Sequence, residues 1–206
     1  MESALREFGS APGLRLIETM LWDGAAFPRL PLHLARLTRG AAALGWPAPQ
    51  VTAPLATLSP AQPARVRLTY GAAGDVSLEV GALPAAKPQW RLGLAEVRLA
   101  SADPWLTVKS TRRAAYDLAR AALPAAVDEV LLLNERAEVC DGTITTVFFD
   151  RGKGLRTPPL TSGLLPGVLR AELGCPEEVL LAQDLPRVRL WVGNAVRGLI
   201  PATFSV

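Results

Sequence analysis

Lysine is rare in this chain, and one of its lysines stands in a setting suited to chemistry. Only three of the 22 basic residues are lysines, namely Lys87, Lys109 and Lys153. Because arginine supplies positive charge elsewhere, a retained lysine suggests chemistry that needs an amine able to lose its proton. Lys109 follows the apolar run Trp105-Leu106-Thr107-Val108, where partial desolvation would lower its pKa. The structural alternative is a lysine that extends its ammonium group to solvent at a strand end.

An activated lysine used with an organic cofactor most often indicates pyridoxal phosphate, whose pyridine ring accepts electrons. Such a site needs an acidic partner for the ring nitrogen, and an arginine and backbone N–H groups for the phosphate. The chain offers Asp141 before an apolar run, Arg36 in a helical pattern, and Leu165-Pro166-Gly167 before a helix whose first turn could bind an anion. An ordinary turn at Asp141-Gly142 and a surface position for Arg36 remain the alternatives.

Composition disfavours several other kinds of protein. His33 is the single histidine and only Cys140 and Cys175 could join it, so we expect no metal site. No Gly-x-Ser-x-Gly motif is present for a serine hydrolase. The net charge is +3 and the isoelectric point is near 9.2, but the basic residues are scattered, which disfavours a nucleic-acid partner. Prolines interrupt the long uncharged stretch at residues 40–64, so we expect no membrane span and a cytoplasmic protein.

Hydrophobic periodicity predicts two domains, of which the first is α+β. Extended runs are expected at residues 14–22, 64–70, 76–83, 90–99, 129–133, 144–150, 179–181 and 188–192. Helices are expected at Leu32–Leu44, from a cap at Ser110 to about Leu123, and at Val168–Leu173. The pattern changes near residue 102, which predicts a first domain at residues 1–100 and a second at 101–206. Since paired strands alternate with few helices, a doubly wound parallel sheet is disfavoured.

The candidate residues lie in motifs that follow one another in a fixed order. These motifs are Leu16–Met20, His33–Leu37, Lys109–Asp117, Asp128–Glu135, Asp141–Phe149, Thr157–Leu160 with Gly163–Arg170, and Asn194–Gly198. In this order the chain resembles the class IV, or fold-type IV, pyridoxal-phosphate-dependent enzymes over about residues 14–201. Within that class it is most similar to the 4-amino-4-deoxychorismate lyase branch.

The resemblance implies a fold and an activity. The fold would be of the D-amino acid aminotransferase type, with a small α+β amino-terminal domain, a larger barrel-like α/β carboxy-terminal domain, the cofactor between them, and a homodimer completing the pocket. The enzyme would convert 4-amino-4-deoxychorismate to 4-aminobenzoate and pyruvate, a step of folate biosynthesis. A class IV aminotransferase of branched-chain or D-amino acids is one alternative, and a degenerate non-catalytic homologue is another.

The resemblance also implies a role for each candidate residue. Lys109 would bind the cofactor as an imine, Arg36 would bind its phosphate, and Asp141 would face the pyridine nitrogen. Backbone N–H groups would complete the phosphate site at Val168, Leu169, Asn194 and Ala195. The substrate would be contacted by Arg112, Arg113 or Tyr116, for which a solvated helix face or simple packing is the alternative.

Four positions depart from the family pattern. Asp141 stands where glutamate is usual, Thr146 where asparagine is usual, Leu169 where threonine is frequent, and Ala195 where serine or threonine is frequent. A carboxylate that is one methylene shorter must come closer to the ring or act through a water. The loss of two hydroxyl groups from the phosphate site predicts weaker retention of the cofactor.

Overall fold

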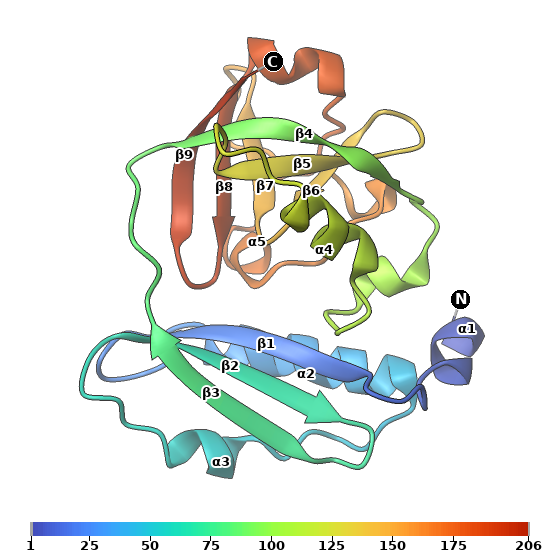
Figure 1. Cartoon of the computed structure of the whole chain (residues 1–206), viewed down its shortest axis with the longest axis vertical. Coiled ribbons are helices and arrows are strands. Elements are labelled where there is room, and N and C mark those ends of the chain that lie inside the picture. The colour runs from blue at the N-terminus through green and yellow to red at the C-terminus, as the bar shows by residue number, and fades with distance from the viewer. Residues whose placement is uncertain (1, 206) are drawn as a thin grey trace. The chain divides into compact units, whose positions relative to one another are not determined.

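The computed structural model describes residues 2–205, and the chain forms two compact units (Figure 1). The first unit comprises the chain up to Ala85 together with Thr107–Arg112. The second comprises Ala86–Leu106 and the chain from Arg113 onward. Residues 90–99, expected in the first domain, belong to the second unit because they pair with two of its strands.

The first unit is a three-stranded antiparallel sheet with a long helix against one face. Its strands β1 (Arg15–Trp22), β2 (Ala64–Gly71) and β3 (Val76–Ala82) are neighbours in that order. Helix α2 (Leu30–Leu44) lies so close to β1 that a Cβ on Gly40 would be 3.2 Å from Leu16 Cδ2. The helix ends at Gly45, whose φ of 72° favours glycine. The short helices α1 (Glu2–Glu7) and α3 (Thr52–Ala56) complete this unit.

The segment that contains Lys109 pairs with the edge of β1. The N–H of Ile17 donates to the Lys109 carbonyl and the N–H of Thr111 to the Arg15 carbonyl, each at 2.8 Å, with Leu16 opposite Ser110. Ser110 therefore does not cap a helix: α4 (Ala114–Ala121) begins four residues later, and the predicted start was wrong. The apolar run before Lys109 is mostly a 3₁₀ turn, Pro104–Thr107, rather than a strand.

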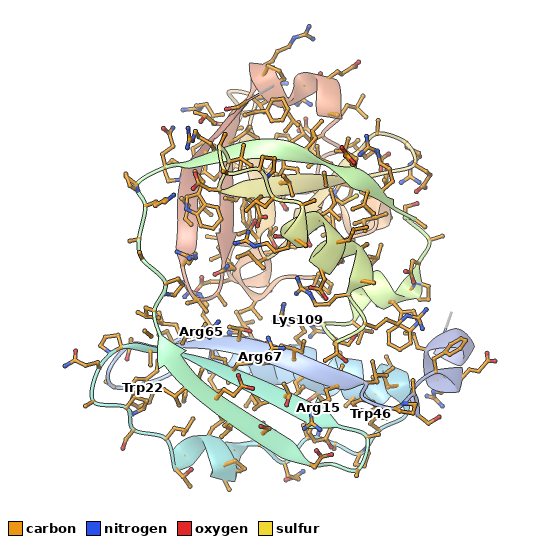
Figure 2. All side chains as sticks on the ribbon, in the orientation of Figure 1. Arg15, Trp22, Trp46, Arg65, Arg67 and Lys109 are labelled. Atoms are coloured by element: carbon orange, nitrogen blue, oxygen red, sulfur yellow. The ribbon has the colours of Figure 1, made fainter. Side chains whose placement is uncertain are left out.

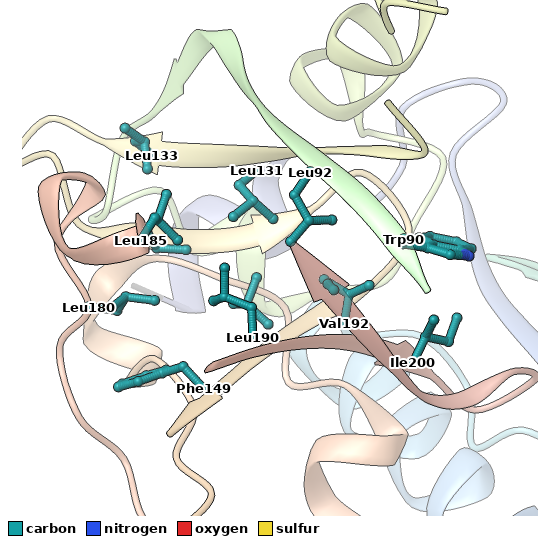
Figure 3. Close-up of a cluster of buried hydrophobic side chains, with 13 residues drawn as sticks. Trp90, Leu92, Leu131, Leu133, Phe149, Leu180, Leu185, Leu190, Val192 and Ile200 are labelled. Carbon is teal, nitrogen blue, oxygen red and sulfur yellow. The ribbon is translucent and has the colours of Figure 1, made fainter. Parts of the chain in front are cut away.

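The second unit is a closed six-stranded barrel. Its strands, in order around the barrel, are β4 (Trp90–Leu99), β5 (Glu129–Asn134), β6 (Val139–Gly142), β7 (Thr146–Asp150), β8 (Arg189–Asn194) and β9 (Gly198–Phe204). Strand β4 pairs in parallel with β5 and β9, and the other pairs are antiparallel. Leu92, Leu131, Phe149 and Val192 are fully buried in one core cluster (Figure 3).

A second core cluster lies on the other side of the same strands, because successive side chains of a strand point to opposite faces. Leu131 and Leu133 belong to the first cluster, whereas Leu132 of the same strand belongs to the second. Ala119 of α4 packs in this second cluster beside Leu132 and Cys140. Helix α5 (Val168–Leu173) and 3₁₀ turns at Leu160–Ser162 and Ala182–Arg187 complete the described elements of the unit.

Several predicted strands differ from the observed ones. Strands β6 and β9 were not predicted, because the polar pair at Asp141-Gly142 and the residues Gly198 and Pro201 are atypical of strands. Residues 179–181 form no strand, only a single bridge between Glu138 and Leu181. The strand predicted at 144–150 begins at Thr146, after a turn at residues 142–145. Within residues 2–205, no helix has the length and hydrophobicity needed to cross a membrane.

Candidate active site

Arg36 is a buried residue of α2 whose guanidinium is held by a carboxylate from the sheet. Its Nε donates to Glu18 Oε1 at 2.8 Å and its Nη2 to Glu18 Oε2 at 2.6 Å. His33, one turn earlier on the helix, has its Nδ1 2.6 Å from Glu18 Oε2. All three side chains are nearly inaccessible to solvent, with residue exposures of 2–7%. The alternative of a surface arginine is therefore wrong for Arg36.

The charge of Glu18 is stabilised by its two partners. Burial acts to raise the pKa of this carboxyl, but the Arg36 guanidinium, with further hydrogen bonds from Arg36 and His33, outweighs burial and lowers it. Glu18 is thus ionised at neutral pH and keeps Arg36 in one orientation. A fixed guanidinium suits phosphate, which it can bind through two N–H groups at once.

Lys109 lies on the face of the first unit's sheet that is turned away from α2. Since Ser110 is opposite Leu16 on the α2 face, Lys109 must be opposite Ile17 on the other face. The register of β1 and β2 puts Arg65 and Arg67 on this same face. Figure 2 shows these basic side chains on this part of the molecule. The face that carries the candidate nucleophile is therefore positively charged.

In the second unit, the predicted cofactor residues gather on three neighbouring strands and one helix. Asp141 of β6 is opposite Thr146 of β7, which is opposite Gly193 of β8. Asp141 is 3% exposed, and its Oδ2 accepts a hydrogen bond from the N–H of Leu165 at 3.2 Å. Its carboxylate thus has a fixed, buried position, unlike that of an exposed turn aspartate.

The predicted phosphate donors lie close to this strand trio. A Cβ on Gly193 would be 2.6 Å from Leu169 Cδ2, so α5 packs directly on β8. A Cβ on Gly167, the residue before α5, would be 2.5 Å from Thr146 Oγ1. Asn194 Oδ1 accepts from the N–H groups of Val196 and Arg197 at 3.1 and 3.0 Å and so shapes the turn that contains Ala195. The structure therefore brings together Asp141, Val168, Leu169, Asn194 and Ala195.

Two of the three predicted substrate residues, Arg112 and Arg113, are occupied by other contacts. Arg112 stacks over the Phe8 ring at 5.4 Å. Arg113 pairs with Asp117 at 2.7 Å and donates to the Thr143 carbonyl at 2.9 Å. The Tyr116 hydroxyl is buried and has no hydrogen-bond partner within the described chain. Burial, with Asp141 and Cys140 nearby, raises the pKa of Tyr116 well above 10, so this phenol stays neutral.

Sequence reasoning missed two carboxylates, Glu18 and Glu129, which are 2% and 0% exposed. The available signal was a glutamate within an otherwise apolar strand pattern, since a buried charge needs a partner. The partners of Glu18 and Glu129 could not be identified from sequence, because each is bound by side chains from another segment of the chain. In the described residues, no three histidine, cysteine, aspartate or glutamate side chains gather as a metal site.

Comparison with known proteins shows the family to which the chain belongs. The family model for amino-transferase class IV matches residues 15–203. A Schizosaccharomyces pombe protein, provisionally named an aminodeoxychorismate lyase, is 32% identical over 167 residues, which cover 77% of this chain and 72% of that protein.

Two crystal structures have closely similar folds. A Mesorhizobium loti protein described as an amino-acid aminotransferase is 42% identical, with a TM-score of 0.87 and coverage of 93% of this chain and 100% of the other. The 4-amino-4-deoxychorismate lyase of Pseudomonas aeruginosa is 25% identical, with a TM-score of 0.80 and coverage of 95% and 84%. Together with the family match, these findings confirm the predicted fold and cofactor: the chain belongs to the class IV aminotransferase family of pyridoxal-phosphate enzymes.

Proposed function

We propose that this chain is a lyase that converts 4-amino-4-deoxychorismate to 4-aminobenzoate and pyruvate with pyridoxal phosphate. The observation that supports this most is the 32% identity to the S. pombe protein named as such a lyase. The P. aeruginosa lyase adds support at 25% identity. The proposal includes a homodimer acting in the cytoplasm, in folate biosynthesis.

The described residues fit the cofactor's chemical groups. Arg36 supplies a buried guanidinium fixed by Glu18, which suits a phosphate. Asp141 supplies a buried carboxylate, which suits a protonated pyridine nitrogen. Lys109 supplies the amine that an aldehyde requires. The first turn of α5 and the turn at Asn194 add backbone N–H groups for the phosphate.

When bound, pyridoxal phosphate supplies a ring that accepts the electron pair left on the substrate carbon. Lys109 Nζ takes and returns the protons at the substrate while pyruvate leaves and the substrate ring becomes aromatic. The Asp141 carboxylate holds a proton on the pyridine nitrogen. Arg36 anchors the phosphate equally before and during the reaction, so it acts on cofactor affinity more than on the chemical step.

The first unit offers a binding surface for an acidic substrate. Arg67 is half-buried and lies directly opposite Glu79 in register. Among the described residues, however, the guanidinium groups of Arg65 and Arg67 have no hydrogen-bond or ion-pair partner. Both share the sheet face of Lys109. 4-Amino-4-deoxychorismate carries two carboxylates, and these two guanidinium groups would bind them. They replace Arg112 and Arg113 as our candidates for substrate recognition.

A class IV aminotransferase is the second candidate, favoured by the 42% identity to the M. loti protein described as an amino-acid aminotransferase. Such an enzyme would use the same cofactor residues and differ in its need for a keto acid that accepts the amino group.

The experiment that separates the two activities supplies the cofactor-loaded protein with 4-amino-4-deoxychorismate alone. The lyase releases 4-aminobenzoate and pyruvate in equal amounts without any keto acid. Turnover that appears only when an amino acid and a keto acid are both added would select the aminotransferase. No turnover of either kind would contradict both candidates.

Borohydride reduction followed by peptide mapping tests the role of Lys109. We expect the pyridoxyl label on Lys109 and no label in Lys109→Ala. Lys87→Ala is a matched control, because Lys87 is exposed and pairs with Asp128 at 2.6 Å, and it should label as the parent does. A label on Lys87 or Lys153 would overturn the assignment.

A further inference from the structure

Glu129 is a fully buried carboxylate at the start of β5 that the proposed chemistry does not use. Its exposure is 0%. It is two residues before Leu131, which pairs with Gly142 of β6, so its side chain lies near the end of β6. Burying a charge without partners is unfavourable, so the contacts of Glu129 indicate what it does.

Most of those contacts come from one short turn. Glu129 Oε1 accepts from Thr143 Oγ1 at 2.6 Å, and Oε2 accepts from the Ile144 N–H at 3.2 Å and from Thr145 Oγ1 at 3.1 Å. Arg120 Nη1 is 3.4 Å from Oε1 and adds positive charge. Three consecutive residues of the turn are therefore bound by one side chain.

This turn begins at the residue after Asp141. The N–H of Gly142 donates to the Thr145 carbonyl at 2.8 Å, which closes the turn between the paired residues Asp141 and Thr146. A Cβ on Gly142 would be 2.3 Å from Thr145 Oγ1 and 2.9 Å from Glu129 Oε2. Glu129 thus packs tightly against the backbone that carries Asp141.

Two further side chains hold the turn from outside. Arg113 donates to the Thr143 carbonyl at 2.9 Å, and Asn194 Nδ2 donates to the Ile144 carbonyl at 3.2 Å. Asn194 belongs to the turn expected to bind the cofactor phosphate. The 142–145 turn therefore joins the expected ring-nitrogen end of the site to its expected phosphate end.

We propose that Glu129 is a positioning residue for Asp141: by fixing the 142–145 turn, it sets the place of the Asp141 carboxylate relative to the pyridine nitrogen. The inference rests on the cofactor role proposed above for Asp141. The position of this backbone matters more for an aspartate than for a glutamate, since the shorter side chain has less freedom to compensate for a displaced backbone.

The test compares affinity for pyridoxal phosphate with affinity for its 1-deaza analogue, in which carbon replaces the ring nitrogen. Both ligands carry the same phosphate and aldehyde, so their ratio of dissociation constants reports the effect of the ring nitrogen. The part of this ratio that Asp141→Asn removes reports the contact with Asp141. A hydrogen bond to a charged group predicts that the full-length parent prefers pyridoxal phosphate by at least about tenfold, and that Asp141→Asn loses this preference. Glu129→Gln should lose a large part of the parent's preference for pyridoxal phosphate over the 1-deaza analogue.

Asp150→Asn is the matched control. Asp150 also binds a turn, accepting from the N–H groups of Gly152, Lys153 and Gly154, but that turn is at the other end of β7. This variant should keep the parent's preference. If Glu129→Gln does not fold, Thr145→Val removes one donor of the turn at nearly constant volume and should reduce the preference in the same direction.

Three results would overturn the inference: the parent's preference retained in the folded Glu129→Gln or Thr145→Val variant, an equal loss in Asp150→Asn, or a parent with no preference. A parent protein that binds neither pyridoxal phosphate nor its 1-deaza analogue contradicts the proposed function itself. A folded Glu129→Gln variant that binds both ligands with the parent's ratio of dissociation constants contradicts only the role of Glu129.

Discussion

At the residue scale, Asp141 provides the sharpest test of the cofactor site. Asp141→Asn keeps the volume but removes the negative charge, so it should still bind cofactor and lose most of its turnover. Asp141→Glu should remain active if the site accepts one more methylene, at an overpacking cost of about 1–3 kcal/mol. Steady-state kinetics and cofactor titration measure both. An Asp141→Asn variant as active as the parent would show that the carboxylate only shapes the turn.

The role of Arg36 must be tested with a single and a double variant, because substitution of Arg36 alone also leaves the buried Glu18 carboxylate unpaired. Arg36→Ala leaves the buried Glu18 carboxylate without its main partner, and breaking such a pair costs about 3–5 kcal/mol. We expect Glu18→Gln combined with Arg36→Ala to recover much of that stability in urea unfolding. Cofactor affinity should stay weak in both variants, and excess cofactor should restore much of the activity by raising the bound fraction. Affinity equal to the parent's in either variant would contradict the phosphate role.

At the element scale, the turn between β6 and β7 should tolerate no side chain at Gly142. Gly142→Ala places a methyl group 2.3 Å from Thr145 Oγ1, so this turn must shift. Overpacking predicts a loss of about 1–3 kcal/mol in the free energy of unfolding, measured in urea. Gly93→Ala in β4 is the control, because its nearest neighbours would be 3.6 Å away and it should leave stability nearly unchanged. Equal losses would contradict the close packing around Glu129.

Elements with strong local signals were predictable from the sequence. Helix α5 was predicted with its observed bounds, since a glycine stands on each side of an apolar pattern. At Ser110 the local signal was misleading. A serine at this position favours a helix cap, but the structure pairs Ser110 with Leu16 of β1 instead. The chemical types at Arg36 and Asp141 were recognisable in sequence. Their partners Glu18 and Leu165 were not, because those contacts join segments far apart in the chain.

At the scale of the whole molecule, acid stability should depend on Glu138. Hydrogen bonds from Arg136, then from Asn134 and Ser162, lower the pKa of this carboxyl from 4.5 to about 2. Because the folded state binds this proton less readily than the unfolded state, the stabilisation is complete above pH 4.5 and is lost as the pH falls towards 2.

Glu138→Gln should therefore remove on the order of 1–3 kcal/mol of stability at neutral pH and little of it near pH 2. Urea unfolding at several pH values measures the difference. Glu135→Gln is the control: the pKa of Glu135 is also lowered to about 2, but its side chain is 52% exposed, so solvent screens its charge. Identical pH profiles for the two variants would contradict the role assigned to Glu138.

The parallel pairing of β4 with β9 has a consequence for synthesis on the ribosome. Strand β4 ends at Leu99 and its partner begins at Gly198, so translation must add about a hundred residues before the barrel can close. During that interval one edge of β4 stays open in the nascent chain, and open strand edges invite pairing with other chains. We therefore expect chaperones that bind nascent chains to matter most in the interval between the release of β4 and that of β9.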